Sequence, residues 1–217
     1  MLPYNKELFK EFLESFDYNF IEKLHSVNVS ADGSTFYYDS GNVSGDLESM
    51  KIQVLSHIQV LEELKPKRIL EVGTHKAQYA YLAKKFLPEV EIVTFGIDEP
   101  SQICVDMVNE YYVDKFIEFH HGDSLETLSS YETDKKFDLA WIDGGHSYEC
   151  AISDLKNCAR LGICTILLDD SRTYPDSVGR AMIDFNEQFG YNLISTTDDC
   201  RGIARLEKIT EETNENS

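Results

Sequence analysis

KRILEVGTHKAQYAYLAKK, residues Lys67–Lys85, is the stretch of sequence that decides the fold. It begins with a short apolar and β-branched run, 68–72, which follows a proline and stops at Gly73, as a buried parallel strand does. After the glycine, apolar residues recur at helical spacing from Ala80 to Leu87. A strand that leads through a glycine turn into a helix forms a ligand-binding corner, because bare backbone there lets a ligand come close. The stretch predicts the first unit of a Rossmann-like α/β sheet.

The turn itself indicates which ligand this corner takes. A dinucleotide site needs G-x-G-x-x-G, so that a pyrophosphate can rest on the helix N-terminus. Here the pattern is Glu71-x-Gly73-x-x-x-Ala77, which resembles motif I of the class I S-adenosylmethionine-dependent methyltransferases, E-x-G-x-x-x-G, with Ala77 in place of the last glycine. The resemblance implies that Gly73, with Thr74 and His75, lies against the methionine part of the cofactor. It also implies that Glu71 holds the amino group of the cofactor or orders the loop. Carboxylates suit this cofactor, since it carries a sulfonium and an ammonium and no phosphate.

A second expected strand, 91–98, ends in Asp98, which lies 25 residues after Gly73. In nucleotide-binding α/β folds the acid at the end of the second strand accepts hydrogen bonds from ribose hydroxyls, and roughly 20 residues separate it from the glycine turn. Asp98 is therefore predicted to bind the ribose. The alternative is an ordinary surface acid in a turn.

A third expected strand, 117–120, leads into Gly122, Asp123 and Ser124. In methyltransferases of this class an acid turn at this place lies beside the adenine ring, and the resemblance extends to these three residues. Asp and Ser also cap helix N-termini well, and both roles fit here.

Two further expected strands, 137–143 and 163–168, end in acids, Asp143 after the first and Asp169 with Asp170 after the second. Consecutive strands of such a sheet usually lie side by side, so the three carboxylates should meet at the carboxyl edge, where ligands bind. Carboxylates gathered there repel one another unless a cation joins them. Mg²⁺, which prefers oxygen ligands, is the expected cation.

The segment IDGGHSYE, 142–149, followed by Asp169 and Asp170, resembles the signature of a methyltransferase subfamily related to the antibiotic-sugar O-methyltransferases and, more distantly, to catechol O-methyltransferase. With motif I, the resemblance covers residues 65 to 207. It implies that Asp143, Asp169 and Asp170 hold Mg²⁺ and that His146 accepts the proton of the substrate hydroxyl.

The last part of the chain favours the same fold. Residues 191–196 and 202–207 are expected strands joined by a link too short for a parallel crossover, so they must pair as a hairpin. A terminal antiparallel hairpin is typical of the methyltransferase fold and not of a plain dinucleotide fold. The predicted cofactor-binding domain therefore spans 65–209, and the polar residues 210–217 are expected to be a disordered tail.

Residues 1–64 are expected to form N-terminal helices, because apolar residues recur at helical spacing over 5–24 and again before the first strand. Between these helices, 26–49 is a loop rich in Ser, Asn, Asp and Gly. Its Tyr37 and Tyr38 either cover the substrate as part of a lid or serve as a plain hydrophobic anchor. The first helix fits a dimer interface as well as a core, so a homo-oligomer stays open.

Composition limits the partners. The net charge of −19 argues against nucleic acid and anionic membranes as partners. The chain has five cysteines and no C-x-x-C pair, which favours a reduced compartment. No secretory leader and no run of about 18 apolar residues is found, so a cytoplasmic protein is expected.

The leading hypothesis is an O-methyltransferase that uses S-adenosylmethionine and modifies a hydroxyl of a small molecule such as a sugar or a natural product. One alternative is an NAD-dependent oxidoreductase or epimerase, which the missing glycines and the hairpin disfavour. The other is a catalytically silent interaction module with the same fold, for which the departure at Ala77 is the main argument. The sequence does not identify the acceptor.

Overall fold

The computed structural model describes residues 17–27, 57–197 and 202–209. The predicted helix over 5–24 is therefore seen only in its last part. The expected lid loop with Tyr37 and Tyr38 and the expected tail lie outside the described residues, and the division of the chain at residue 65 stays a prediction. No helix of the described part is long and apolar enough to cross a membrane.

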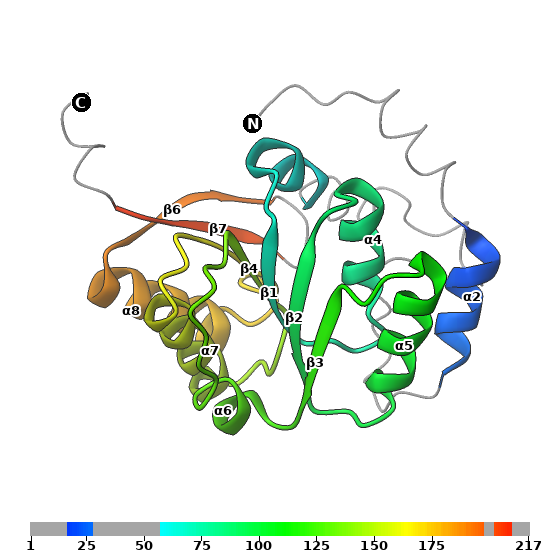
Figure 1. The fold of residues 1–217 in the computed structure, drawn as a ribbon. Helices are drawn as coiled ribbons and strands as arrows, with labels where there is room; N and C mark the ends of the chain where they lie inside the picture. The colour runs from blue at the N-terminus through cyan, green and yellow to red at the C-terminus, as the bar shows by residue number, and fades with distance from the viewer. Residues whose placement is uncertain (1–16, 28–56, 198–201, 210–217) are drawn as a thin grey trace.

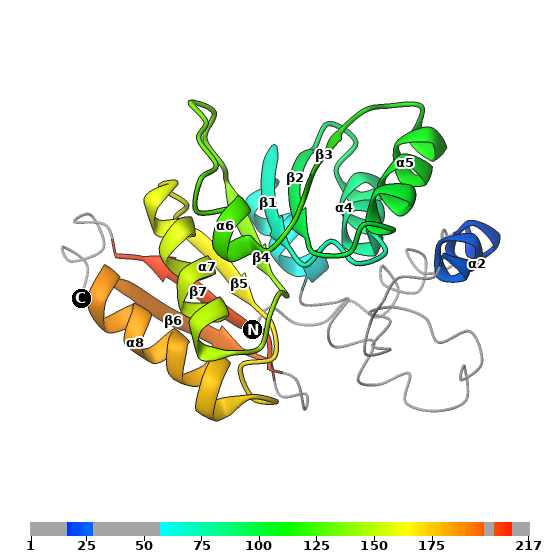
Figure 2. The ribbon, with the colours of Figure 1, turned by 90° about the horizontal axis from the view of Figure 1, so that it is seen from below.

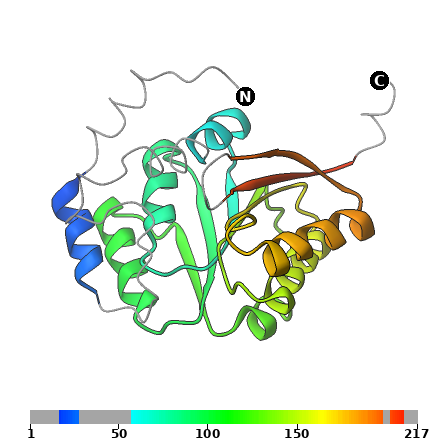
Figure 3. The same cartoon turned by 180° about the vertical axis from the view of Figure 1, so that it is seen from behind.

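A seven-stranded sheet forms the centre of the molecule, in the order β3-β2-β1-β4-β5-β7-β6 (Figure 1). Its strands are β1 (Arg68–Val72), β2 (Glu91–Gly96), β3 (Ile117–His121), β4 (Leu139–Ile142), β5 (Thr165–Leu168), β6 (Tyr191–Thr196) and β7 (Ala204–Lys208). The first five are parallel, and β7 pairs antiparallel with both β5 and β6. This confirms the predicted methyltransferase-type sheet with its terminal hairpin. Figure 3, seen from behind, places the orange and red hairpin strands at the opposite end of the sheet from β3.

Helices cover both faces of the sheet (Figure 2). They are α2 (Tyr18–Ser26), an unlabelled helix over 57–64, α4 (Gln78–Phe86), α5 (Ser101–Tyr112), α6 (Ser124–Thr127), α7 (Tyr148–Arg160), η1 (Pro175–Gly179) and α8 (Arg180–Phe189). Because neighbouring residues of a strand point to opposite faces, Ile69 and Trp141 lie on the face that α4, α5 and 57–64 cover, and α2 packs on α4 and α5 through Phe20. Leu70 and Ile142 pack under α7 and α8.

The central strand β1 is buried along its whole length, as the sequence run predicts. Two strands end earlier than expected: β2 stops at Gly96, so Ile97 and Asp98 belong to the following loop, and β4 stops at Ile142, just before Asp143. Residues 175–189 form a turn of π-helix, η1, followed directly by the α-helix α8. Such π-helical turns often occur near functional sites.

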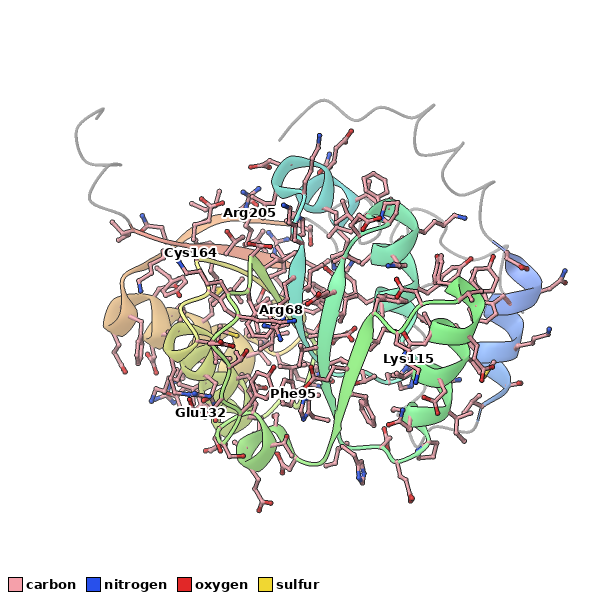
Figure 4. The ribbon with its side chains drawn as sticks, viewed as in Figure 1. Arg68, Phe95, Lys115, Glu132, Cys164 and Arg205 are labelled. Atoms are coloured by element: carbon pink, nitrogen blue, oxygen red, sulfur yellow. The ribbon has the colours of Figure 1, made fainter. Side chains whose placement is uncertain are left out.

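An ion pair fastens the 57–64 helix onto the hairpin. The guanidinium of Arg205 on β7 donates to both carboxylate oxygens of Glu63, at 2.7 and 2.8 Å. Figure 4 shows the Arg205 side chain beside this helix. At the first described residue of the same helix, His57 packs edge-on against Trp141 with ring centroids 4.0 Å apart. The helix therefore covers the part of the sheet next to the carboxyl ends of β1 and β4.

Candidate functional site

The turn after β1 brings the ends of two strands into direct contact. Gly73 has a φ of +101°, and a Cβ placed there would lie 1.9 Å from the carbonyl oxygen of Asp143. The Gly73 N–H donates to the carbonyl of Phe95 on β2 at 2.8 Å, and the Asp143 N–H donates to the carbonyl of Val72 at 2.8 Å. Only glycine fits this position, because both the backbone angle and the space exclude a side chain.

A cavity of about 570 Å³ opens at this edge of the sheet. It is lined by ten of the residues that the sequence predicts for the site: Glu71, Gly73, Thr74, His75, Asp98, Gly122, Asp123, Ser124, Asp143 and His146. They come from the end of β1 and from the turns after β1, β2, β3 and β4, so four separate segments of the chain converge on one pocket. Phe95, labelled in Figure 4, lines it from β2. The cavity is of the size that holds a nucleotide-like molecule.

Two residues that line this cavity each have a buried polar atom without a hydrogen-bond partner among the described residues. Glu71 is 1% exposed, and burial raises the pKa of its carboxyl to about 8, against a smaller opposing effect of a hydrogen bond with Thr94. Within the described residues, neither Oε2 of Glu71 nor the hydroxyl of Tyr79 has a hydrogen-bond partner. Both side chains line the cavity, and the ring of Tyr79 stacks on Trp141 at 5.5 Å. Buried polar groups are normally paired, so these atoms indicate where a polar ligand binds.

The turn predicted to lie beside the adenine also caps a helix. The side chain of Asp123 accepts a hydrogen bond from the N–H of Leu125 at 2.9 Å, as an N-cap residue does. Gly122, Asp123 and Ser124 all line the cavity as well. The capping role and the position at the cavity therefore occur together. Asp98 is half-buried on the opposite wall, after the end of β2.

A cluster of three polar side chains adjoins the cavity at the ends of β4 and β5. One ligand atom each from Asp143, His146 and Asp170 lies within 4.8 Å of those of the other two. Nε2 of His146 is 3.1 Å from Oδ2 of Asp170. The imidazole also stacks on the ring of Tyr174, with centroids 4.3 Å apart. Thr173 donates its hydroxyl hydrogen to Oδ1 of Asp170 at 2.8 Å.

The two acids after β5 have different surroundings. Asp170 has a left-handed φ of +59° and lies in the cluster, although it does not line the cavity. Asp169 is 2% exposed, and its Oδ1 accepts the N–H of Asp170 at 2.8 Å. The structure thus brings Asp143 and Asp170 of the expected metal ligands together, and the third member of the cluster is His146, expected to accept the proton.

One buried acid near the site is missing from the sequence-based prediction. Asp154 on α7 is fully buried, and burial raises the pKa of its carboxyl to about 7. A Cβ on Gly144 would lie 3.3 Å from Oδ2 of Asp154, so the side chain of this acid packs against the turn after β4. The signal was present in the sequence, because Asp154 falls at helical spacing among the inward-facing Ala151, Leu155 and Cys158.

Comparisons with known proteins agree with this geometry. A family model described as a methyltransferase domain matches residues 55–171. This confirms the predicted class of protein, a class I S-adenosylmethionine-dependent methyltransferase. The chain belongs to this methyltransferase-domain family.

Several solved structures share the fold over nearly the whole chain. The methyltransferase PaMTH1 of Podospora anserina, bound to SAH, has 18% sequence identity and a TM-score of 0.63, over 97% of this chain and 99% of its own. Cofactor-bound Rv0187 from MTB has 14% identity and a TM-score of 0.68, over 95% and 98%. An O-methyltransferase from Bacillus cereus in complex with SAH has 16% identity and a TM-score of 0.57, over 96% and 94%. At such identities the similarity establishes the fold.

Proposed function

We propose that the protein transfers the methyl group of S-adenosylmethionine to a hydroxyl of a small molecule such as a sugar or a natural product. The observation that carries this proposal is the pairing of two features in one cavity. Glu71, whose buried Oε2 has no hydrogen-bond partner among the described residues, lines the cavity with the motif I turn, and Asp143 and His146 of the cluster with Asp170 line it too. The similarity to the Bacillus cereus O-methyltransferase supports the oxygen as the methylated atom.

The donor side of the cavity suits S-adenosylmethionine. The carboxylate of Glu71 accepts a hydrogen bond from the ammonium group of the cofactor, which gives its unpaired oxygen a partner. Gly73, Thr74 and His75 lie along the methionine part of the cofactor. Asp98 accepts the ribose hydroxyls from the opposite wall. Gly122, Asp123 and Ser124 border the adenine.

The acceptor hydroxyl is proposed to lose its proton at the cluster of Asp143, His146 and Asp170. The donor chemistry of this cluster, with two carboxylates close together, fits a divalent cation such as Mg²⁺. A bound cation at this place lowers the pKa of a substrate hydroxyl. His146 suits either of two roles, the proton acceptor implied by the resemblance or a ligand of the cation. Holding the hydroxyl in line with the methyl group is the main contribution of the surrounding pocket.

The partners follow from the same features. A cavity of about 570 Å³ suits a small acceptor beside the cofactor. The net charge of −19 argues against nucleic acid and anionic membranes. The cysteine spacing supports a reducing compartment such as the cytoplasm.

The test is a thermal-shift and calorimetric titration of the purified full chain with S-adenosylhomocysteine and, separately, with NAD. A ligand that binds only the folded state raises the melting temperature by mass action. We expect a shift with S-adenosylhomocysteine and none with NAD, followed by methyl transfer to hydroxyl compounds in an acceptor screen with labelled S-adenosylmethionine. A shift with NAD alone would favour the oxidoreductase or epimerase, and no shift with either would favour the silent interaction module.

A further inference from the structure

We propose that His146 is a metal ligand, so that Asp143, His146 and Asp170 form a centre that prefers a first-row transition metal, such as Mn²⁺, Fe²⁺ or Zn²⁺, over Mg²⁺. This inference rests on the proposed function, because it concerns the cation of the same site. It differs from the sequence-based expectation in two residues. His146 takes the place of Asp169 among the ligands, and the proton of the acceptor hydroxyl would then pass to solvent water and not to the imidazole.

The distances within the cluster suit a metal ion. Metal bonds to imidazole nitrogen and carboxylate oxygen of about 2.0–2.2 Å put two neighbouring ligand atoms roughly 3 Å apart. Nε2 of His146 and Oδ2 of Asp170 are 3.1 Å apart. The ligand atom of Asp143 lies within 4.8 Å of both, which is within the reach of a small side-chain rotation.

Groups outside the cluster contact the side chains of Asp170 and His146 and the backbone of Asp143. Asp170 receives the hydroxyl hydrogen of Thr173 on its other oxygen, Oδ1, which leaves Oδ2 toward His146. The imidazole stacks on Tyr174 at an angle of 22° between the rings. Asp143 is anchored through its N–H to the carbonyl of Val72. Such outer contacts are what orient metal ligands in proteins.

Charge also favours a cation here. Two carboxylates whose oxygens lie within 4.8 Å of each other repel, and a divalent ion between them removes that cost. Asp169, by contrast, accepts the N–H of Asp170 with its Oδ1 and is not part of the cluster of Asp143, His146 and Asp170, so it is the poorer third ligand.

The type of ligand decides which metal binds. Mg²⁺ prefers oxygen ligands and keeps several waters, whereas imidazole suits zinc, iron and other transition metals. One imidazole with two carboxylates is a mixed set that Mn²⁺, Fe²⁺ and Zn²⁺ accept, and three protein ligands leave coordination positions open for a substrate oxygen.

The experiment measures metal binding without any acceptor. The full chain is treated with a chelator and titrated with Mn²⁺, and the electron paramagnetic resonance signal of free Mn²⁺ reports the bound fraction. Competition with Mg²⁺ then gives the selectivity. We expect one Mn²⁺ per chain, bound at least about tenfold more tightly than Mg²⁺. We expect His146→Asn to weaken Mn²⁺ binding by about 10- to 100-fold.

Three further variants sharpen the result. His146→Asp turns the site into an all-oxygen set, so the preference for Mn²⁺ over Mg²⁺ should fall. His120→Asn is the matched control, since His120 pairs with Glu118 on β3, and it should leave Mn²⁺ binding unchanged. Asp169→Asn should keep Mn²⁺ affinity within about threefold, with its fold checked by circular dichroism.

The inference is overturned if His146→Asn binds Mn²⁺ as the parent chain does, or if Mg²⁺ binds as tightly as Mn²⁺. Loss of Mn²⁺ binding in a folded Asp169→Asn variant would restore the three-aspartate site instead. Calorimetry with S-adenosylhomocysteine separates the two proposals. Binding of S-adenosylhomocysteine without binding of Mn²⁺ refutes the metal centre alone, and no binding of S-adenosylhomocysteine refutes the proposed function.

Discussion

Replacing Glu71 by Gln should stabilise the ligand-free protein and weaken its binding of the cofactor. Burial raises the pKa of this carboxyl from its ordinary value of 4.5 to about 8, so the folded state holds a proton that the unfolded chain releases between these pH values. The folded state binds more protons in this window, and stability therefore falls as pH rises from about 4.5 to about 8. A pKa shift of this size lowers the free energy of unfolding by at most about 3 kcal/mol at pH 7 and by about 1 kcal/mol at pH 5.

Glu71→Gln removes this cost, because an amide does not ionise. Urea denaturation should show a larger unfolding free energy for the variant than for the parent chain at pH 7, with a much smaller difference at pH 5. Glu89→Gln, which removes the same charge from an exposed position after α4, is the control and should show no such pH dependence. A difference between Glu71→Gln and the parent that is equal at both pH values would refute the reasoning.

The same substitution tests the cofactor assignment. If Glu71 accepts the ammonium of S-adenosylhomocysteine, its removal should weaken binding by roughly 10- to 100-fold, the usual size for a hydrogen bond to a charged group. Docking of the ammonium would also ionise the carboxyl. Calorimetry of the parent chain at pH 7 in buffers of different ionisation heats should therefore show release of nearly one proton on binding. Binding by Glu71→Gln within threefold of the parent would show that this side chain does not hold the cofactor.

Three other changes have definite expected outcomes. Gly73→Ala puts a Cβ 1.9 Å from the backbone oxygen of Asp143, so denaturation should show a loss of about 3 kcal/mol or more, and calorimetry should show no binding of S-adenosylhomocysteine. Asp154→Asn should raise the melting temperature at pH 8 more than at pH 5. Burial raises the pKa of Asp154 to about 7, and the ionised carboxylate, which destabilises the fold, is the main form only at the higher pH. Equal shifts of the melting temperature at both pH values would contradict this. Glu63→Gln breaks the two-point ion pair with Arg205 and should cost about 1 kcal/mol at low salt and less at high salt, measured by denaturation in both.

The sheet and its ligand-binding corner could be predicted because each rests on a local signal. The run 68–72 is apolar without alternation, as a strand buried on both faces requires, and it ends at Gly73, whose Cβ position meets the backbone of Asp143 just after β4. The hairpin β6–β7 followed from the length of its link, since so few residues allow antiparallel pairing only. Spacing along the chain was enough in both cases.

The arrangement around the acids after β5 could not be predicted in the same way. Two adjacent residues at the end of a strand differ in direction, but which of them joins the cluster with Asp143 and His146 depends on the backbone angles after the strand ends. Asp170 has a left-handed backbone conformation that turns it toward this cluster, and the spacing of apolar residues in the sequence does not predict that conformation. The sequence grouped Asp169 with Asp170 by adjacency, whereas the cluster contains His146, which reaches it from the turn after β4.

The departure at Ala77 does not argue for a silent protein once the backbone is considered. Ala77 has a left-handed φ of 53°, which is the conformation that a glycine at this motif position would supply. A left-handed alanine costs about 1–2 kcal/mol, while its fully buried methyl contributes about 0.8 kcal/mol and its smaller backbone entropy in the unfolded chain contributes about 0.4–1 kcal/mol. These terms nearly cancel, so alanine can maintain the loop that glycine usually forms. The cavity beside that loop is open and lined by the predicted residues, and the case for a catalytically silent module therefore loses its main structural argument.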